Sequence, residues 1–185
     1  MQPLYEAVRS GDRERVKSLV AADPPLAIFA AAMLGDTAEL ETLLSSNRSL
    51  LTAVSPDGWF PLHLAAHFAQ TGAVRLLLSK GAQAGARSTN ALQNTALHAA
   101  AAGRAAEAGK LLIDRGANVN ATQHGGWAPL HAAAQNGDIE FARVLVDAGA
   151  DVNVRAENQQ RPLDMALTKG QQAMVDFLES HGARL

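Results

Sequence analysis

Hydrophobic residues along this chain recur at the spacing of amphipathic helices, and each helical segment is short. In residues 138–149, "DIEFARVLVDAG", Phe141 and Leu145 lie one helical turn apart with charged residues between the apolar positions. This pattern predicts a helix with one buried side. The segment ends at Gly149, a residue type that commonly follows the last turn of a helix. The alanine-rich stretch 128–135 just before it predicts a second, shorter helix.

This pair of segments is one unit of a repeat. Its marker is a Leu-His pair that recurs at intervals of 35 and 33 residues and then, as Leu-Asp, after another 33. The marker positions are Leu62-His63, Leu97-His98, Leu130-His131 and Leu163-Asp164, with looser copies at Leu4-Tyr5 and Ile28-Phe29. These markers predict a single domain of six units, at approximately 1–24, 25–57, 58–90, 91–125, 126–158 and 159–185. Such units cannot bury an apolar face alone, so they must stack on their neighbours.

Glycines mark the turns of most units. Those predicted between the two helices are Gly11, Gly35, Gly137 and Gly170, and those after the second helix are Gly81, Gly116, Gly149 and Gly182. Extended segments such as "NVNAT" then lead into a projecting turn, which we call a finger. The first unit is short and joins the second through residues 23–25, so we expect no finger there. Charged residues in the first and last units predict solvent-facing caps.

Residues 128–153, "APLHAAAQNGDIEFARVLVDAGADVN", resemble the ankyrin repeat, a 33-residue unit with a T-P-L-H-x-A signature. The resemblance extends over nearly the whole chain. It implies an all-α fold, an ankyrin-repeat solenoid of stacked helix-turn-helix units with β-hairpin-like fingers along one edge. It also implies that Asn120 and Asn153 brace the fingers. The function it implies is a non-catalytic scaffold that binds another protein or peptide through the concave groove and the fingers.

Composition excludes several other functions. The 16 basic and 18 acidic residues give a net charge of −2, without the basic excess of a nucleic-acid binder. No apolar run approaches about 18 residues and no signal peptide is visible, so we expect no membrane partner and a cytoplasmic location. The absence of cysteine excludes disulfides and thiolate metal sites. We expect a monomer without cofactors, and the 38 alanines suggest a GC-rich bacterial genome.

Three histidines in register, His63, His98 and His131, raise the question of a metal site. Packed helices lie about 8–10 Å apart, whereas zinc–nitrogen bonds are about 2.0–2.1 Å long. Equivalent histidines of neighbouring units therefore cannot share an ion, and the resemblance implies hydrogen bonds within and between repeats instead. His67 and His124 lie outside this register. For His67 a partner contact and an ordinary exposed role both stay open, and for His124 the ordinary role is favoured.

The chain contains no recognisable catalytic motif. It has no G-x-S-x-G, no H-E-x-x-H and no P-loop. Acidic stretches after the glycine turns, as in "GDIEFA", favour a role at helix N-termini over acid–base catalysis. The alternative function is a small-molecule or metal-dependent enzyme that uses His67 and neighbouring groups.

The fourth unit departs most from the repeat pattern. Arg104 stands at the usual glycine position, and Gly109 stands where the second helix should offer a branched apolar residue. A glycine inside a helix costs about 1 kcal/mol relative to alanine, so we predict a thin interface there. The preceding segment 83–95 is two residues longer than its equivalents and predicts an enlarged finger. Such loops often carry function, although insertions at loop tips are also simply tolerated.

Two tryptophans, Trp59 and Trp127, share one position on the concave side of different fingers. Contiguous exposed apolar residues mark binding sites, and tryptophan is enriched among interface hot spots. A second interpretation stays open, in which each ring packs over the neighbouring finger. The predicted partner-binding residues are Met33, Leu34, Trp59, His67, Phe68, Leu92, Asn94, His124, Trp127, Gln135, Asn136, Gln160 and Lys169.

Overall fold

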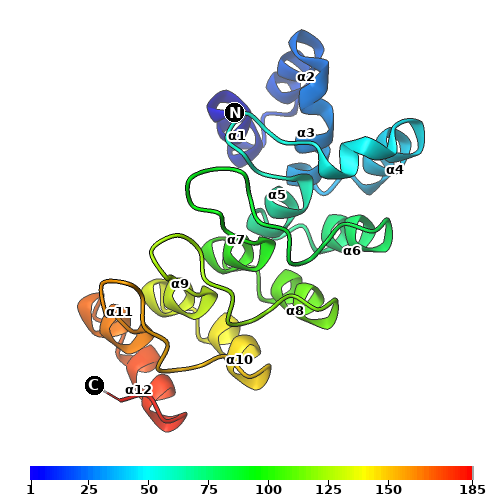
Figure 1. Ribbon diagram of the computed structural model, residues 1–185. Helices are drawn as coiled ribbons and strands as arrows, with labels where there is room; N and C mark the ends of the chain where they lie inside the picture. Colours follow the sequence, from blue (N-terminus) through cyan, green and yellow to red (C-terminus); the bar gives the residue numbers. More distant parts are fainter. Residues whose placement is uncertain (185) are drawn as a thin grey trace.

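The computed structural model describes residues 1–184. This part of the chain contains twelve α-helices in six consecutive pairs, stacked into an elongated solenoid (Figure 1). The first helices of the pairs are α1 (Gln2–Ser10), α3 (Ala27–Leu34), α5 (Pro61–His67), α7 (Ala96–Ala102), α9 (Pro129–Asn136) and α11 (Pro162–Thr168). The second helices are α2 (Arg13–Ala22), α4 (Thr37–Ser46), α6 (Thr71–Ser79), α8 (Ala106–Asp114), α10 (Ile139–Asp147) and α12 (Gln172–Ser180). None of them is long and apolar enough to cross a membrane.

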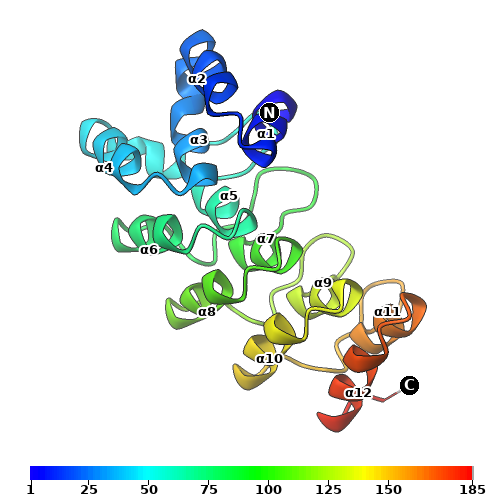
Figure 2. The ribbon, with the colours of Figure 1, turned by 180° about the vertical axis from the view of Figure 1, so that it is seen from behind.

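The helices form two rows, one of first helices and one of second helices. Each first helix packs on the next, from α1 through α11, and the second helices do the same from α4 through α12. The rows are visible from both sides of the molecule (Figures 1 and 2). The terminal helix α2 instead lies against α3 and the short 3-10 helix η1 (Pro24–Leu26). The N-terminal pair is thus placed differently from the other five.

The repeated leucines occupy equivalent places, as the period predicts. Each is the second residue of its helix and is buried: Leu62, Leu97, Leu130 and Leu163 are 0–3% exposed. Proline begins α5, α9 and α11, where its missing N–H needs no partner. Asp12, Asp36 and Asp138 cap α2, α4 and α10 by accepting a backbone N–H bond, which confirms the capping role predicted for these acids.

The turn within each pair holds one residue in the left-handed conformation. These residues are Gly11, Gly35, Ala69, Arg104, Gly137 and Gly170. Arg104 therefore stands at the glycine position, as predicted from the sequence. The left-handed region disfavours side chains with a Cβ, so the two non-glycine turns at Ala69 and Arg104 are strained.

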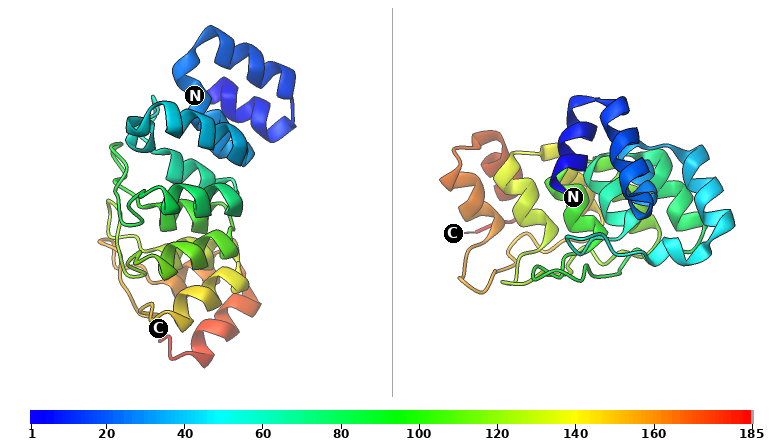
Figure 3. Two further views of the ribbon diagram at one scale, coloured as in Figure 1. Left: turned by 90° about the vertical axis from the view of Figure 1, so that its right-hand side faces the viewer. Right: turned by 90° about the horizontal axis from the view of Figure 1, so that it is seen from above.

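The fingers emerge along one edge of the stack (Figure 3, left). No finger separates the first two pairs, which η1 joins as expected, and α4 is followed by the 3-10 helix η2 (Arg48–Thr52). The later fingers are tight hairpin-like turns, with one isolated antiparallel bridge between Arg87 and Thr95 in the described part of the chain. The bond that closes the third-repeat finger runs from Ser88 N–H to the Asn94 carbonyl. This finger is two residues longer than the one closed between Ser55 and Trp59, as predicted.

The prediction of a thin interface at α8 is wrong. Gly109 is buried, and the ring of Phe141 in α10 is fully buried directly against it. The larger side chain of the next repeat thus fills the space that the missing side chain of α8 leaves.

Candidate binding groove

Four residues occupy one equivalent position at the base of successive fingers. Each accepts the hydrogen bond that closes its finger, and each lies just before the first helix of its pair. The pairs are Trp59 with Ser55 N–H (2.9 Å), Asn94 with Ser88 N–H (2.8 Å), Trp127 with Gln123 N–H (2.9 Å) and Gln160 with Ala156 N–H (2.9 Å). The register inferred from the sequence for the two tryptophans is therefore correct.

The histidines of the Leu-His pairs form hydrogen bonds to the finger-base residue of the next repeat. In each case Nε2 reaches the main-chain carbonyl of the following finger base. The pairs are His63 with Asn94 (3.1 Å), His98 with Trp127 (2.9 Å) and His131 with Gln160 (3.1 Å). The structural role expected for these histidines is confirmed, because every bond joins one repeat to the next.

These imidazoles are neutral. Burial lowers the pKa of His63 and of His98 to about 4, and it also lowers the pKa of His131. Nδ1 of His98 accepts the Thr95 N–H (3.2 Å), which leaves Nε2 as the protonated donor. With Nδ1 and Nε2 of His98 both bound to the protein, this ring offers no lone pair to a metal ion. No three His, Cys, Asp or Glu side chains within residues 1–184 are grouped so that they could hold one.

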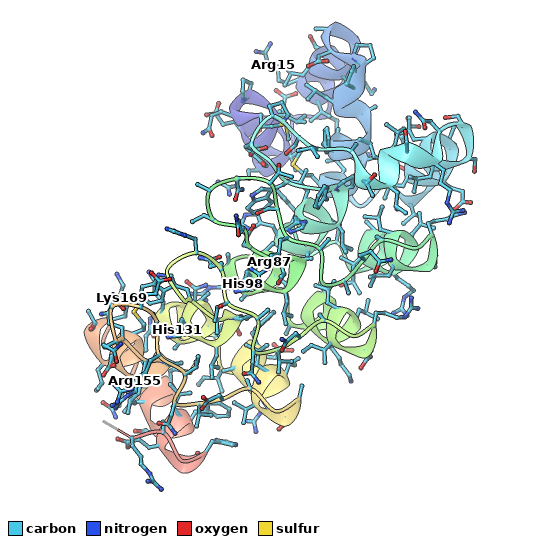
Figure 4. All side chains as sticks on the ribbon, viewed as in Figure 1. Arg15, Arg87, His98, His131, Arg155 and Lys169 are labelled. Atoms are coloured by element: carbon cyan, nitrogen blue, oxygen red, sulfur yellow. The ribbon has the colours of Figure 1, made fainter. Side chains whose placement is uncertain are left out.

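An open groove of about 440 Å³ lies between the fingers and the first helices α5, α7, α9 and α11. Six of the predicted residues line it: Trp59, His67, Leu92, Asn94, Trp127 and Gln135. Figure 4 shows His98 and His131, which also line it, along the row of first helices. Every side chain of the lining is apolar, amide or imidazole, so the groove carries no formal charge at neutral pH.

The two indoles pack on histidines and still face the groove. The Trp59 ring meets His67 edge-on at 5.5 Å between centroids, and the Trp127 ring meets His131 at 5.1 Å. Both tryptophans are half-buried. Each ring thus packs on the first helix of its own repeat, and contact with a partner stays a prediction.

Asn94 and Leu92 come from the enlarged finger but differ in burial. Leu92 is 47% exposed at the tip, as expected for a contact residue. Asn94 is only 5% exposed, so it belongs to the floor of the groove and not to its rim. Its Oδ1 atom is buried without a hydrogen-bond partner among residues 1–184.

A second hollow of about 330 Å³ continues from Trp59 and His67 toward α1. The hydroxyl of Tyr5 donates to Asp57 at 2.5 Å, and burial together with this bond raises the pKa of Tyr5. A guanidinium nitrogen of Arg9 lies 3.5 Å from Nε2 of His67. Burial lowers the pKa of His67, and the charge of Arg9 lowers it further.

Three predicted contact residues pack within the protein and lie outside the groove lining, and of these only Met33 is fully buried. Met33 is fully buried in α3, and Leu34 is half-buried against the core. Phe68 stacks on Tyr5 at 5.9 Å, with the Arg9 guanidinium 5.8 Å from its ring centroid. The reason is the N-terminal pair, whose helix α1 packs on α3 and covers this end of the concave side.

Four further predicted residues lie outside the groove lining: His124, Asn136, Gln160 and Lys169. His124 is exposed at a finger tip, and its backbone N–H donates to the carbonyl of Leu92 (2.8 Å). Asn136 braces α9 against α7 through Nδ2 and the Ala101 carbonyl (3.3 Å). The side chain of Gln160 is bound within its own finger, and Lys169 is exposed at the end of α11.

Sequence reasoning missed part of the lining. Gln123, Ala132 and Met165 line the groove but were not predicted. Ala132 lies three residues before Gln135 in α9, and Met165 lies at the equivalent position 33 residues later. Helical spacing from Gln135 was the signal that could have found both.

The two-row stack, the finger edge and the histidine bonds define an α-helical repeat protein with an open groove along its fingers. A family model described as ankyrin repeats (3 copies) matches residues 4–123, 82–156 and 122–185. The chain therefore belongs to the ankyrin-repeat family. Ankyrin repeats are generally protein–protein interaction modules and are typically not enzymes. A search among curated proteins finds none that matches this chain.

Proposed function

We propose that this chain is a non-catalytic scaffold that holds another protein or peptide in the concave groove and along the fingers. The observation that carries the proposal is the pair of indoles. Trp59 and Trp127 stand at equivalent finger positions, and both line one uncharged groove of about 440 Å³. Tryptophan is prominent among the few residues that dominate interface energies, particularly in pockets that exclude water.

The fingers are held rigidly to one another, which supports a preformed binding surface. Main-chain bonds join successive tips: Thr89 N–H to Gly58 (2.8 Å), His124 N–H to Leu92 (2.8 Å) and Glu157 N–H to Gly125 (2.9 Å). A surface that is already ordered loses little conformational entropy when a partner binds. We expect Trp59, Trp127 and Leu92 to contribute most of the affinity.

Affinity capture from the source lysate tests the proposal with four baits. They are the wild-type chain, Trp59→Ala/Trp127→Ala, Leu92→Asp and Glu39→Ala/Lys110→Ala. The last is the matched control, because its two exposed residues lie on the second helices α4 and α8, away from the groove. A partner should be captured by the wild type and the control and lost from both groove variants.

Circular dichroism melts of all four baits check folding. Leu92→Asp keeps the test decisive if the tryptophan variant unfolds, because Leu92 is 47% exposed and its replacement disturbs little packing. A partner retained by the groove variants and lost from the second-helix variant would contradict the proposal.

A further inference from the structure

One position of the first helices becomes more buried toward the N-terminal end of the concave side. It lies five residues after the marker leucine or isoleucine of each unit. In the last three pairs its residues are exposed: Ala102, Gln135 and Thr168. In the two pairs before them, His67 is half-buried and Met33 is 0% exposed. The concave side therefore continues as far as α3, where another part of the chain covers it.

The covering element is helix α1. It packs on α3 and lies beside the row of first helices, on the side away from the second helices (Figures 1 and 2). Tyr5 of α1 reaches the third repeat, where its hydroxyl donates to Asp57 and its ring stacks on Phe68. The hollow of about 330 Å³ remains between α1 and this repeat, and Trp59 and His67 line both this hollow and the groove. The groove thus continues beneath α1.

The N-terminal pair is attached to the rest of the stack by side chains alone. Within residues 1–184, no main-chain hydrogen bond joins residues 1–22 to a residue beyond 26. The polar contacts that do so run from Tyr5 to Asp57 and from Arg9 to His67. Helices α1 and α2 together bury three residues, whereas α3 alone buries six. A segment with so few buried contacts opens at a lower free energy than the core.

The opening takes the form of local unfolding. Helices α1 and α2 have nine and ten residues, and helices of this length are marginal in water without tertiary packing. Once Tyr5 leaves Asp57 and Phe68, the two helices can therefore unfold while the other five pairs stay folded. Pro24 and Pro25 bound the unfolding segment, because proline lacks the N–H that would continue α2.

We propose that the N-terminal helix pair is a cover that closes one end of the groove and opens by local unfolding. Opening uncovers Met33 and Phe68 and lengthens the surface that a partner can use beyond Trp59. The closed cover lowers the apparent affinity of a partner that needs this length, in proportion to the fraction of open molecules. This inference rests on the proposed function, because the cover regulates access to the same groove.

Native-state amide hydrogen exchange, followed by NMR on the full chain, tests whether the pair opens separately. In the wild type the amides of α1 and α2 should exchange at least about tenfold faster than those of α9. Tyr5→Phe removes only the hydroxyl and should raise the exchange rates of α1 and α2 about fivefold, without changing those of α9. Thr42→Val is the matched control, because its hydroxyl bonds within α4 to the Ala38 carbonyl (3.0 Å). Equal rates in α2 and α9, or unchanged rates in Tyr5→Phe, would overturn the inference.

A single cysteine shows which surface the opening uncovers, because the chain contains none of its own. Met33→Cys places a thiol at the covered end of the concave side, and Ala102→Cys places one at the equivalent exposed position. Iodoacetamide should label Met33→Cys slowly, and adding Tyr5→Phe should raise that rate about fivefold. Ala102→Cys should be labelled rapidly with or without Tyr5→Phe. If Tyr5→Phe left the labelling of Met33→Cys unchanged, α1 would not be the cover of this position.

The two experiments separate this inference from the proposed function, because neither involves a partner. A cover that does not open overturns the inference and leaves the groove beside Trp59 and Trp127 as the proposed binding surface. A failure to capture a partner overturns the proposed function and leaves the exchange rates of α1 and α2 as they are. The exchange measurement needs no cysteine variant, so it decides the inference even if Met33→Cys does not fold.

Discussion

The ring of Phe141 occupies the space that a side chain at residue 109 would need. A Cβ atom on Gly109 would lie 2.7 Å from Cε2 and 2.8 Å from Cζ of that ring, closer than van der Waals contact allows. The glycine of α8 and the phenylalanine of α10 are thus complementary across two repeats. This relationship turns an unfavourable helix residue into part of the core.

The variant Gly109→Ala should destabilise the chain although alanine is the better helix former. Alanine gains about 1 kcal/mol of helix propensity, but overpacking a filled core costs about 1–3 kcal/mol. We expect a net loss of about 1 kcal/mol in the free energy of unfolding, measured with urea. In the double variant with Phe141→Leu, the loss should be smaller than the sum of the two single losses.

Gly85→Ala is the control for this pair. Gly85 has an ordinary negative φ, and nothing would lie within 4 Å of its added Cβ. Its unfolding free energy should change by no more than about 0.5 kcal/mol. If Gly109→Ala were as stable as this control, the packing account of α8 and α10 would be wrong.

Ala69 offers a stabilising substitution. It holds φ 56° in the turn between α5 and α6, where four of the other five pairs have glycine. Ala69→Gly should raise the free energy of unfolding by about 0.5–1 kcal/mol, because the strain of a left-handed alanine exceeds the extra entropy of an unfolded glycine. The same change at exposed Ala38 in α4 should instead lower it by about 1 kcal/mol. If urea titrations showed that Ala69→Gly lowers the free energy of unfolding, as Ala38→Gly does, residue 69 would not be strained.

The hydroxyl of Thr95 forms a hydrogen bond with His98 that has no counterpart in the fifth repeat. It lies 2.9 Å from Nδ1 of His98, whereas Ala128 reaches Nδ1 of His131 only through its backbone N–H. Thr95→Ala should cost about 1 kcal/mol, and Ala128→Thr should gain a similar amount by adding the same bond. Thermal melts of both variants check this. A loss of stability in Ala128→Thr would mean that the threonine does not fit beside His131.

The repeat period was enough to predict what recurs in every unit. It placed Leu62 and Leu130 in equivalent cores, and it placed Trp59 and Trp127 at equivalent finger positions. It could not predict contacts that depend on a departure from the repeat. The partial burial of Phe68 follows from the placement of α1, whose Tyr5 stacks on it, and no period encodes that placement.

The repeat pattern also could not predict that a residue of one repeat compensates for an unfavourable residue of its neighbour. Gly109 is unfavourable when its own helix is considered, and only the approach of Phe141 shows why glycine fits there. Asn94, at the end of the enlarged finger, is one of the predicted partner-binding residues, and nothing in the pattern predicts that its side chain is buried. The path of that finger instead brings it to the groove floor, where the Asn94 carbonyl is bound by His63.

The buried histidines make the stability of the stack depend on pH. Burial lowers the pKa of His63 and of His98 to about 4, whereas an unfolded histidine titrates near 6.5. Between these values the unfolded chain binds more protons than the folded chain, so stability falls as the pH falls. The stability that these two neutral histidines contribute is complete above about pH 6.5 and is lost progressively as the pH falls toward 4. Each of the two histidines should remove about 2 kcal/mol between pH 7 and pH 5.

Urea titrations at several pH values measure this dependence, and a histidine variant isolates one site. His98→Asn loses its own bonds, but its stability should fall less steeply with acid than the wild type, by about 1.4 kcal/mol per pH unit near pH 5. The comparison is therefore between the slopes of unfolding free energy against pH for the variant and the wild type, and not between their absolute stabilities. The ring signals of His63 and His98 in NMR spectra should also stay in their neutral positions down to about pH 5. A wild-type stability that is constant from pH 7 to pH 5 would mean that these rings are not the buried, neutral links between repeats.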